Sequence, residues 1–333
     1  MMKLDEKEII QLFIAKLKKN NLKDFGQNDV TVVPTQRFRS FSSTPVLVLK
    51  CDMLVESTDV PDLMAPWQVA RKSVVSVISD LSAKGAKPYV SLISLGLPLY
   101  YSKKATASLI NGFKLASREF GFIIAGGDTN QTKELIIDCC IMGFTGGNRL
   151  EVPGRNGACS GDLIVVSGLF GYPPAGLKIL MDGVKATDKF RRRAVRSVLQ
   201  PEPRMKFGSA LSKYFTSSID SSDGLATSLY ELAKQSNVDL YLNRIPCSPD
   251  LLNFANNSSL NSSELIFHGG EEFEIVCTIP RSKIEKVISC AKRSRIRLLV
   301  IGEVKNGYGN VFVKSRMEDE YSLLEDRGYT HLS

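Results

Sequence analysis

Histidine is scarce in this sequence, and the cysteines show no metal-binding spacing. Only His268 and His331 occur in 333 residues, and none of the seven cysteines belongs to a CxxC pair. A histidine-rich metal site and a Ser-His-Asp triad are therefore disfavoured. We interpret the cysteines as buried thiols rather than as disulfides or zinc ligands. The chemistry of the chain has to be sought among its aspartates.

Long apolar runs are also missing. No stretch approaches the roughly 20 uninterrupted apolar residues that a membrane helix needs. Residues 1–19 alternate charged and apolar side chains as an amphipathic helix does, and they lack the apolar centre of a signal peptide. We therefore expect a cytoplasmic protein that does not associate with membranes.

Positive charge exceeds negative charge, with a formal net charge of +8. Such a balance fits an anionic partner, either a nucleic acid or a small molecule such as a nucleotide. The densest basic run, at 191–193 with Arg196, has no interleaved aromatic residues, so it indicates a solvated helix face. We expect no nucleic-acid partner.

The length corresponds to two domains at roughly 100 to 200 residues each. The turn-rich segment 145–161 separates two halves that both mix strands and helices, which indicates an α/β or α+β architecture. We place an N-terminal domain at 1–148 and a C-terminal domain at 149–333. In the first half the pattern predicts helices at 67–84 and 103–120 and strands at 46–51, 89–95, 122–125 and 134–144.

Aspartates recur where predicted strands end in turns. They are Asp52, Asp80, Asp128, Asp220 and Asp223, and Asp29 precedes the first strand. A single aspartate at such a place is usually a turn former or a helix cap. Several together favour a magnesium site, because a few carboxylates and the phosphates of a substrate are the ligands that magnesium takes.

Two glycine-containing motifs accompany these aspartates. In GGDT at 126–129, paired glycines would let backbone N–H groups approach phosphate at the end of a buried strand. In DSSDGL at 220–225, two carboxylates and two hydroxyls precede a predicted helix, where one residue would suffice as a cap. No P-loop and no protein-kinase motif occurs, so a kinase activity would need another fold.

A third motif, GGEEFE at 269–274, precedes an apolar strand. Its acidic residues could either solvate a tight turn or bind a cationic or hydroxyl-bearing substrate. The residues alone leave both interpretations open.

Taken together, these motifs resemble those of the thiamine-monophosphate kinases. The segment 52–56, DMLVE, resembles the DMLVEG stretch of that family, and 79–88, SDLSAKGAKP, resembles SDLAAMGAxP. GGDT, the RNGA sequence at 155–158, the IDSSDGL sequence at 219–225 and GGEEFEI at 269–275 match further family motifs in the same order. The resemblance extends from about residue 26 to the glycine, aromatic residue and histidine at 328–331.

The resemblance implies a fold and a reaction. The fold is that of aminoimidazole ribonucleotide synthetase, in which the strands of an N-terminal α/β domain form a barrel with those of a second subunit, beside a C-terminal α+β domain. A homodimer is then expected. The implied reaction transfers the γ-phosphoryl group of ATP to thiamine monophosphate, giving thiamine diphosphate and ADP, with several Mg²⁺ ions neutralising the two polyanions.

The resemblance also implies roles for particular residues. The implied metal ligands are Asp29, Asp52, Asp80, Asp128, Asp220, Ser222 and Asp223. The implied nucleotide contacts are Gly126, Gly127, Asp128, Arg155 and Ser222. The implied contacts of the acceptor are Asp59, Glu272 and Tyr329. The implied catalytic residues, closest to the phosphoryl group that is transferred, are Asp128, Asp220 and Asp223.

Two positions depart from the family pattern. The family signature GxGDD is replaced by GQND at 26–29, so one of two adjacent carboxylates is the amide of Asn28. Asp59 replaces a histidine that borders the acceptor pocket. These departures keep two alternatives open: a related ATP-dependent enzyme with another phosphorylated or heterocyclic acceptor, and a nucleotide-binding protein without catalysis.

Overall fold

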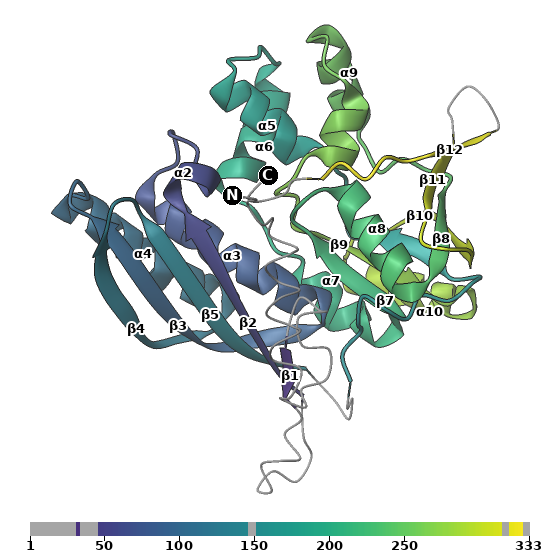
Figure 1. The fold of residues 1–333 in the computed structure, drawn as a ribbon, viewed down its shortest axis with the longest axis horizontal. Helices are drawn as coiled ribbons and strands as arrows, with labels where there is room; N and C mark the ends of the chain where they lie inside the picture. The colour runs from purple at the N-terminus through teal and green to yellow at the C-terminus, as the bar shows by residue number, and fades with distance from the viewer. Residues whose placement is uncertain (1–30, 34–45, 146–150, 315–319, 329–333) are drawn as a thin grey trace, which may run out of the picture.

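The structure is a computed structural model that describes residues 31–33, 46–145, 151–314 and 320–328. Two units of sheet and helix lie side by side in Figure 1, the N-terminal one in purple and blue and the C-terminal one in green to yellow. Helix α3 (Pro66–Ala83) runs between them, and almost every residue from Gln68 onward is buried. A helix in this position is covered on all sides, which explains its apolar and small side chains.

The N-terminal unit is built on a five-stranded sheet with the order β1-β2-β5-β3-β4. The strands are β1 (Thr31–Val33), β2 (Leu47–Val55), β3 (Ala86–Pro98), β4 (Ile123–Thr132) and β5 (Ile136–Thr145). Every second residue of β5 is buried, and Ile137, Cys139 and Ile141 belong to the core formed with α3 and α4 (Lys103–Phe120). This alternation places the described helices against one face of the sheet.

Local signals set the ends of these helices. Helix α3 has a proline at its first position, and the side chain of Gln68 accepts a hydrogen bond from the N–H of Ala65. Helix α4 is capped at its N-terminus by Ser102, whose hydroxyl accepts a hydrogen bond from the N–H of Ala105. It is capped at its C-terminus by Gly121, which is in the left-handed conformation. A single turn, α2 (Glu56–Asp59), joins β2 to the segment before α3.

The C-terminal unit is a seven-stranded sheet with the order β12-β11-β8-β10-β6-β9-β7. Its strands are β6 (Leu163–Val166), β7 (Ser217–Ser221), β8 (Val238–Leu242), β9 (Glu274–Ile279), β10 (Leu299–Asn306), β11 (Val311–Lys314) and β12 (Tyr321–Leu323). Its helices are α5 (Tyr172–Met181), α6 (Asp188–Leu199), α7 (Met205–Leu211), α8 (Leu225–Ser236), α9 (Pro249–Asn257) and α10 (Ile284–Arg293), with short turns η3 (Ser212–Tyr214), η4 (Glu264–His268) and η5 (Arg281–Lys283).

Polar contacts at the end of α3 tie the two units together. The ammonium group of Lys84, which follows α3, is buried and donates to the carbonyl of Ser218 on β7 at 2.6 Å. The hydroxyl of Ser218 donates back to the carbonyl of Ala83 at 2.7 Å. At the other end, Arg71 donates to the carbonyl of Pro201. Because buried polar groups without partners are costly, these bonds favour one relative position of the two units.

The structure corrects two expectations about local conformation. The GGDT motif is not a loop after a short buried strand: it lies inside β4, which continues to Thr132 in parallel register with β3 and is exposed at almost every residue. Helix α9 was not expected, since its end overlaps an Asn/Ser-rich stretch. The predicted helix at 1–19 lies outside the described residues. Within the described ranges, none of the helices combines the length and apolar character that a bilayer crossing demands.

Candidate active site

The junction of α3 and β7 brings aspartates from both units together. Asp80 lies one helical turn before Lys84, and Asp220 lies two residues after Ser218, so both side chains continue along the faces that make the contacts just described. Both carboxylates are nearly buried, with exposures of 5% for Asp80 and 6% for Asp220. Asp223 follows Asp220 in the turn before α8. The docking of the two units therefore determines the carboxylate cluster.

Asp52 of β2 joins this cluster. Burial raises the pKa of Asp52, Lys50 lowers it, and Asp220 and Asp223 raise it further. Carboxylates close enough to raise one another's pKa make a site that attracts a cation. One cation is already present, because the ammonium group of Lys50 lies 2.7 Å from Asp80 Oδ2.

Hydroxyl groups in the segments that carry these carboxylates have no partner within the described part of the chain. They include Ser79 Oγ, which precedes Asp80 in sequence, Ser221 Oγ, which follows Asp220, and Thr227 Oγ1 in the first turn of α8. Buried polar atoms are normally satisfied by protein, water or a ligand. Unpaired hydroxyls beside buried carboxylates are donors and ligands suited to hydrated magnesium and phosphate.

The described residues do not form a closed metal cage. No group of three or more His, Cys, Asp or Glu side chains in the described residues is arranged to hold an ion by itself. Magnesium does not require such a cage, since it commonly keeps several waters and binds one or two carboxylates together with substrate phosphates. The carboxylate cluster therefore fits magnesium that arrives with a nucleotide better than it fits a permanently bound structural ion.

The acidic motif at 269–274 lies next to this cluster. The N–H of Glu271 donates to the carbonyl of Ser222 at 2.6 Å, and the N–H of Phe273 donates to that of Ser221 at 2.8 Å. Glu271 and Phe273 both have positive φ, at 64° and 50°, which is strained for residues other than glycine. Glu271 Oε2 and the neighbouring His268 Nδ1 are buried without a partner in the described residues.

Lys72 of α3 holds this acidic loop against α2. Its ammonium group is buried, forms an ion pair with Glu271 and donates to the carbonyl of Asp59 at 2.6 Å. The side chain of Asp59 accepts from the N–H of Val55 at 2.7 Å, which fixes the turn of α2. Asp59 and Glu271 thus meet at one buried lysine, beside the carboxylate cluster.

Asp128 is not brought to this cluster within one chain. In the sheet register, Asp128 of β4 is opposite Ser94, Ser94 is opposite Asp138, and Asp138 is opposite Met53 of β2. Residues opposite one another share a face, so Asp128 is on the face of Met53, whereas Asp52 is on the other. Strand β4 is also three strands away from β2 in the sheet, about 14 Å at the usual spacing.

The other residues implied by the resemblance are placed as follows. Gly126 and Gly127 lie on β4 with Asp128, and Ser222 lies just after β7, two residues beyond Asp220 and next to Asp223. Arg155 forms a 3.5 Å ion pair with Glu231 of α8. Glu272 is buried and accepts from the N–H of Gly171, so its side chain is turned into the C-terminal unit, in the direction opposite to Glu271. Asp29 and Tyr329 lie outside the described residues.

Sequence reasoning missed the two lysines of the site. Lys50 lies within a strand pattern and Lys72 within a helix pattern, and lysine at such positions is usually solvated. The only signal in the sequence is indirect: Lys72 falls in a run of apolar and small residues that predicts a buried helix. Their partners belong to distant parts of the chain, so the contacts become visible only in the folded structure.

Comparison with known proteins identifies the class first. Residues 28–145 match the family described as AIR synthase related protein, N-terminal domain. The fold is also similar to that of E. coli HypE, a hydrogenase maturation protein, with a TM-score of 0.68 over 95% of each chain at 18% identity. The match over the N-terminal half and the shared fold define an α/β protein with the same fold as HypE.

Full-length relatives then define the family. The chain is 39% identical over 331 residues to the thiamine-monophosphate kinase of Nitrosopumilus maritimus, covering 99% of each chain, and 33% identical over 334 residues to that of Pyrococcus horikoshii, covering 100% of this chain and 97% of the relative. A solved structure described as AaThiL complexed with AMPPCP and TMP matches with a TM-score of 0.83 at 26% identity, covering 100% of this chain and 99% of the other. The chain belongs to the thiamine-monophosphate kinase family.

Proposed function

We propose that this chain transfers the γ-phosphoryl group of ATP to the phosphate of thiamine monophosphate, giving thiamine diphosphate and ADP. Membership of the thiamine-monophosphate kinase family over the whole length supports this reaction. Within the molecule, the observation that carries the proposal is the carboxylate cluster at the junction of the two units. Transfer between two polyanions requires positioning and charge neutralisation, and the acceptor phosphate is already ionised, so no general base is needed.

We propose that Mg²⁺ ions bind with ATP at this cluster. Asp52, Asp80, Asp220 and Asp223 would supply carboxylate oxygens, with Ser222 beside them and Asp29 as a further ligand. The raised pKa of Asp52 and the unpaired hydroxyls of Ser79 and Ser221 support this assignment. When bound, magnesium would neutralise the charge that develops on the transferred phosphoryl group.

We assign the remaining roles by position. Asp128, Asp220 and Asp223 are proposed to be closest to the transfer. Gly126, Gly127, Asp128, Arg155 and Ser222 are proposed to contact the nucleotide, and Asp59, Glu272 and Tyr329 the acceptor. For Asp59 the support is its contact with the buried Lys72 beside the acidic loop. The domain at 1–148 would bind ATP and metal and dimerise, and the domain at 149–333 would complete the site.

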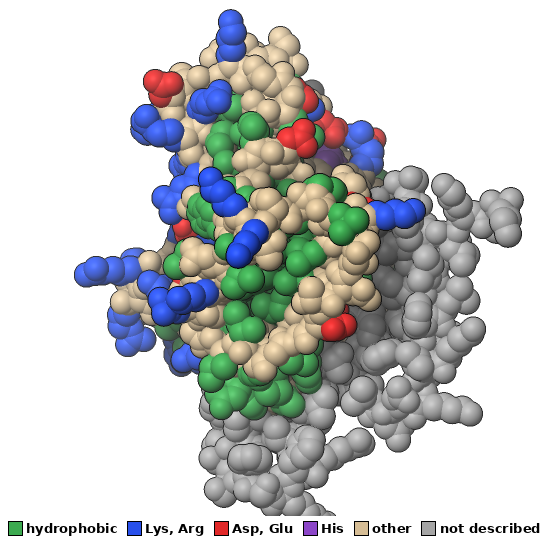
Figure 2. All heavy atoms as spheres, turned by 90° about the vertical axis from the view of Figure 1, so that its left-hand side faces the viewer, with side chains coloured by type: hydrophobic (Ala, Val, Ile, Leu, Met, Phe, Trp, Pro, Cys, Tyr) green, Lys and Arg blue, Asp and Glu red, His purple; other side chains and the backbone are tan. Residues whose placement is uncertain are grey.

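We propose that a second copy of the chain covers the free face and edge of the N-terminal sheet, as in a dimeric barrel. Large apolar side chains are exposed there, including Leu92 at 53%, Met53 at 60% and Ile123 at 62%. Figure 2 shows apolar side chains gathered on the side of the molecule where β3, β4 and α4 lie, bordered by Lys and Arg. An exposed apolar edge strand invites pairing. Asp128 shares this surface, so a second copy would enclose it.

The deciding experiment is an assay of thiamine diphosphate formed from thiamine monophosphate, ATP and magnesium, with ADP measured in parallel. Thiamine diphosphate equal to ADP is the expected result. ADP without thiamine diphosphate would contradict the acceptor and point to another phosphorylated or heterocyclic molecule. Magnesium-dependent ADP binding with no transfer to any acceptor would instead indicate a nucleotide-binding protein without catalysis.

A further inference from the structure

A polar cavity, separate from the carboxylate cluster, lies within the C-terminal unit. It has a volume of about 330 Å³ and lies between α6, the start of α5 and the segments that lead into β9 and β10. Four arginines line it: Arg193, Arg196, Arg204 and Arg297. None of the clustered aspartates of the candidate active site lines this cavity. Its chemistry is therefore that of a site for an anion and differs from that of the carboxylate cluster.

Two of the four arginines are already neutralised by carboxylates. Arg204 forms an ion pair with Glu274 at 2.5 Å, and Arg196 forms one with Glu202 at 3.0 Å. Arg193 and Arg297 form no ion pair with any described residue; Arg193 is stacked 3.9 Å above the ring of Tyr172. The cavity therefore presents two guanidinium groups whose N–H donors bind no carboxylate in the part of the chain that the structure describes.

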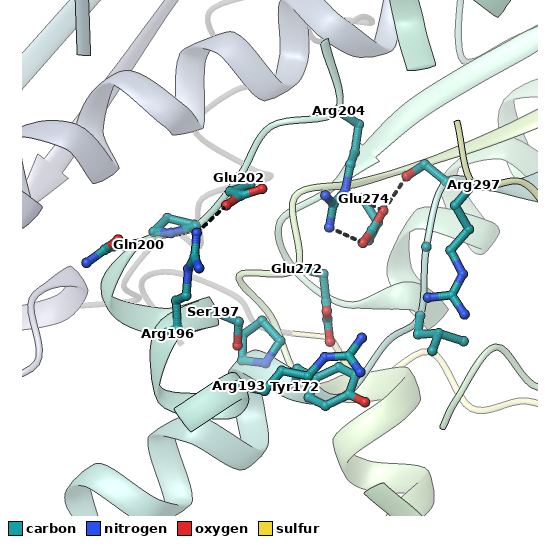
Figure 3. Close-up of a pocket in the computed structure, with 15 residues that line it drawn as sticks. Tyr172, Arg193, Arg196, Ser197, Gln200, Glu202, Arg204, Glu272, Glu274 and Arg297 are labelled. Carbon is teal, nitrogen blue, oxygen red and sulfur yellow. Dashed lines mark hydrogen bonds and ion pairs between the residues drawn. The ribbon is translucent and has the colours of Figure 1, made fainter. Parts of the chain in front are cut away.

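Glu272 lies in the middle of these arginines in Figure 3. Its carboxyl group accepts a hydrogen bond from the N–H of Gly171. Burial raises the pKa of Glu272 well above its ordinary value, and Gly171 and Arg204 only partly oppose this effect. A carboxyl group in its protonated form does not repel an anion and can donate a hydrogen bond to it.

We propose that this cavity binds a small molecule that carries a phosphate group, held between Arg193 and Arg297. A phosphate has three terminal oxygens that accept hydrogen bonds from several directions, whereas a carboxylate is satisfied by one guanidinium fork. On the same wall, the amide of Gln200 offers further donors to the rest of the ligand, and Ser197, whose hydroxyl donates to the carbonyl of Ala194, offers an acceptor. A volume of about 330 Å³ lies at the small end of the range of ligand pockets, which excludes a macromolecule.

The cavity is next to the carboxylate cluster in the chain, and it shares Glu272 with the residues that we assigned to the acceptor. Glu272 lines the cavity, and the preceding residue, Glu271, is held by Lys72 beside the carboxylate cluster. Both residues belong to the strained loop at 269–273. A ligand that binds Glu272 would thus contact the loop that borders the proposed acceptor site, which makes the cavity suited to an effector.

The test is calorimetric titration of the full chain with inorganic phosphate and pyrophosphate, in EDTA so that magnesium does not recruit the anion to the aspartates. Arg193→Met and Arg297→Met should each weaken binding by about ten- to a hundredfold, the scale of losing a charged hydrogen-bonding partner. Arg192→Met, on the same helix but outside the cavity, is the matched control and should bind normally. Asp220→Asn should also bind normally.

Four results would overturn the proposal. Binding that is lost in Asp220→Asn and kept in Arg193→Met would place the anion at the carboxylate cluster. Equal weakening in Arg192→Met and Arg193→Met would reveal nonspecific attraction to a basic helix. The absence of binding at millimolar phosphate and pyrophosphate, or stronger binding of malonate than of either, would exclude a phosphate site. A thermal unfolding scan of each variant establishes that it is folded before titration.

Discussion

At the scale of single residues, the site is a set of like charges held close together by the fold. Asp52 is the clearest case, because burial, Asp220 and Asp223 all raise its pKa, and Lys50 and a hydrogen bond from the backbone of Met53 only partly oppose them. Such an arrangement costs stability in the absence of a cation. The same arrangement gives the site affinity for a cation such as Mg²⁺, which the proposed reaction needs.

Asp52→Asn should therefore stabilise the metal-free protein and inactivate it. A raised pKa means that the folded state holds the proton more tightly than the unfolded chain, so the free energy of unfolding falls as pH rises above the ordinary value of 3.8 and through the raised pKa. In the variant, the free energy of unfolding should no longer fall over this pH range, and at neutral pH it should be about 1 kcal/mol higher than in the wild type. Urea unfolding in EDTA across this pH range measures it, and a pH profile unchanged from wild type would contradict the assignment.

At the scale of elements, two contacts determine where the segments that carry candidate site residues lie. Strand β4 lies so close to β3 that Gly127 has no room for a side chain, and the acidic loop is held against α3 by Lys72. Neither contact is local in sequence. Each one sets the position of an element relative to a distant segment of the chain.

Gly127→Ala should disrupt the pairing of β4 with β3. A Cβ at Gly127 would be 1.7 Å from the carbonyl oxygen of Ile93, a backbone atom that cannot move aside alone. We expect a loss of about 2 kcal/mol or more of unfolding free energy. Gly126→Ala is the matched control, because its Cβ would meet only Leu92 Cδ2 at 3.6 Å. Equal thermal stability of the two variants would be inconsistent with this packing.

Lys72→Met should loosen the acidic loop. The substitution leaves Glu271 without its buried partner, and breaking such a pair costs about 3 to 5 kcal/mol. If the loop borders the acceptor site, the variant should raise KM for thiamine monophosphate more than KM for ATP. Adding Glu271→Gln should recover part of the stability, since the unpaired charge is then removed. A purely structural role would change both KM values equally.

At the scale of the whole molecule, the single chain leaves its N-terminal sheet with an apolar face and Asp128 apart from the other aspartates. A second copy on this surface would bury both. Leu92→Asp should then convert a dimer into a monomer, because it puts a charge into that interface. Leu99→Asp is the control: Leu99 is 84% exposed just beyond β3. Sedimentation equilibrium measures the mass of both variants and of the wild type, and a monomeric wild type would contradict the proposed dimer.

The sequence by itself determined most of the elements and the family. Strand alternation, helix caps and the ordered motifs are local patterns, and α4 has the predicted bounds, 103–120. α9 was missed although Ser248 and Pro249 form an ordinary helix start, because the Asn/Ser-rich stretch that overlaps its end suggested a loop.

Only the tertiary structure decided which of these side chains meet. A strand pattern does not say which face of a paired sheet a residue occupies, so the separation of Asp128 from Asp52 follows from register alone. The contacts of Lys50, Lys72 and Lys84 join segments far apart in the chain. They form because α3 is buried between two sheets, where polar side chains need hydrogen-bond or ion-pair partners. No local pattern in the sequence indicates which distant segment supplies those partners.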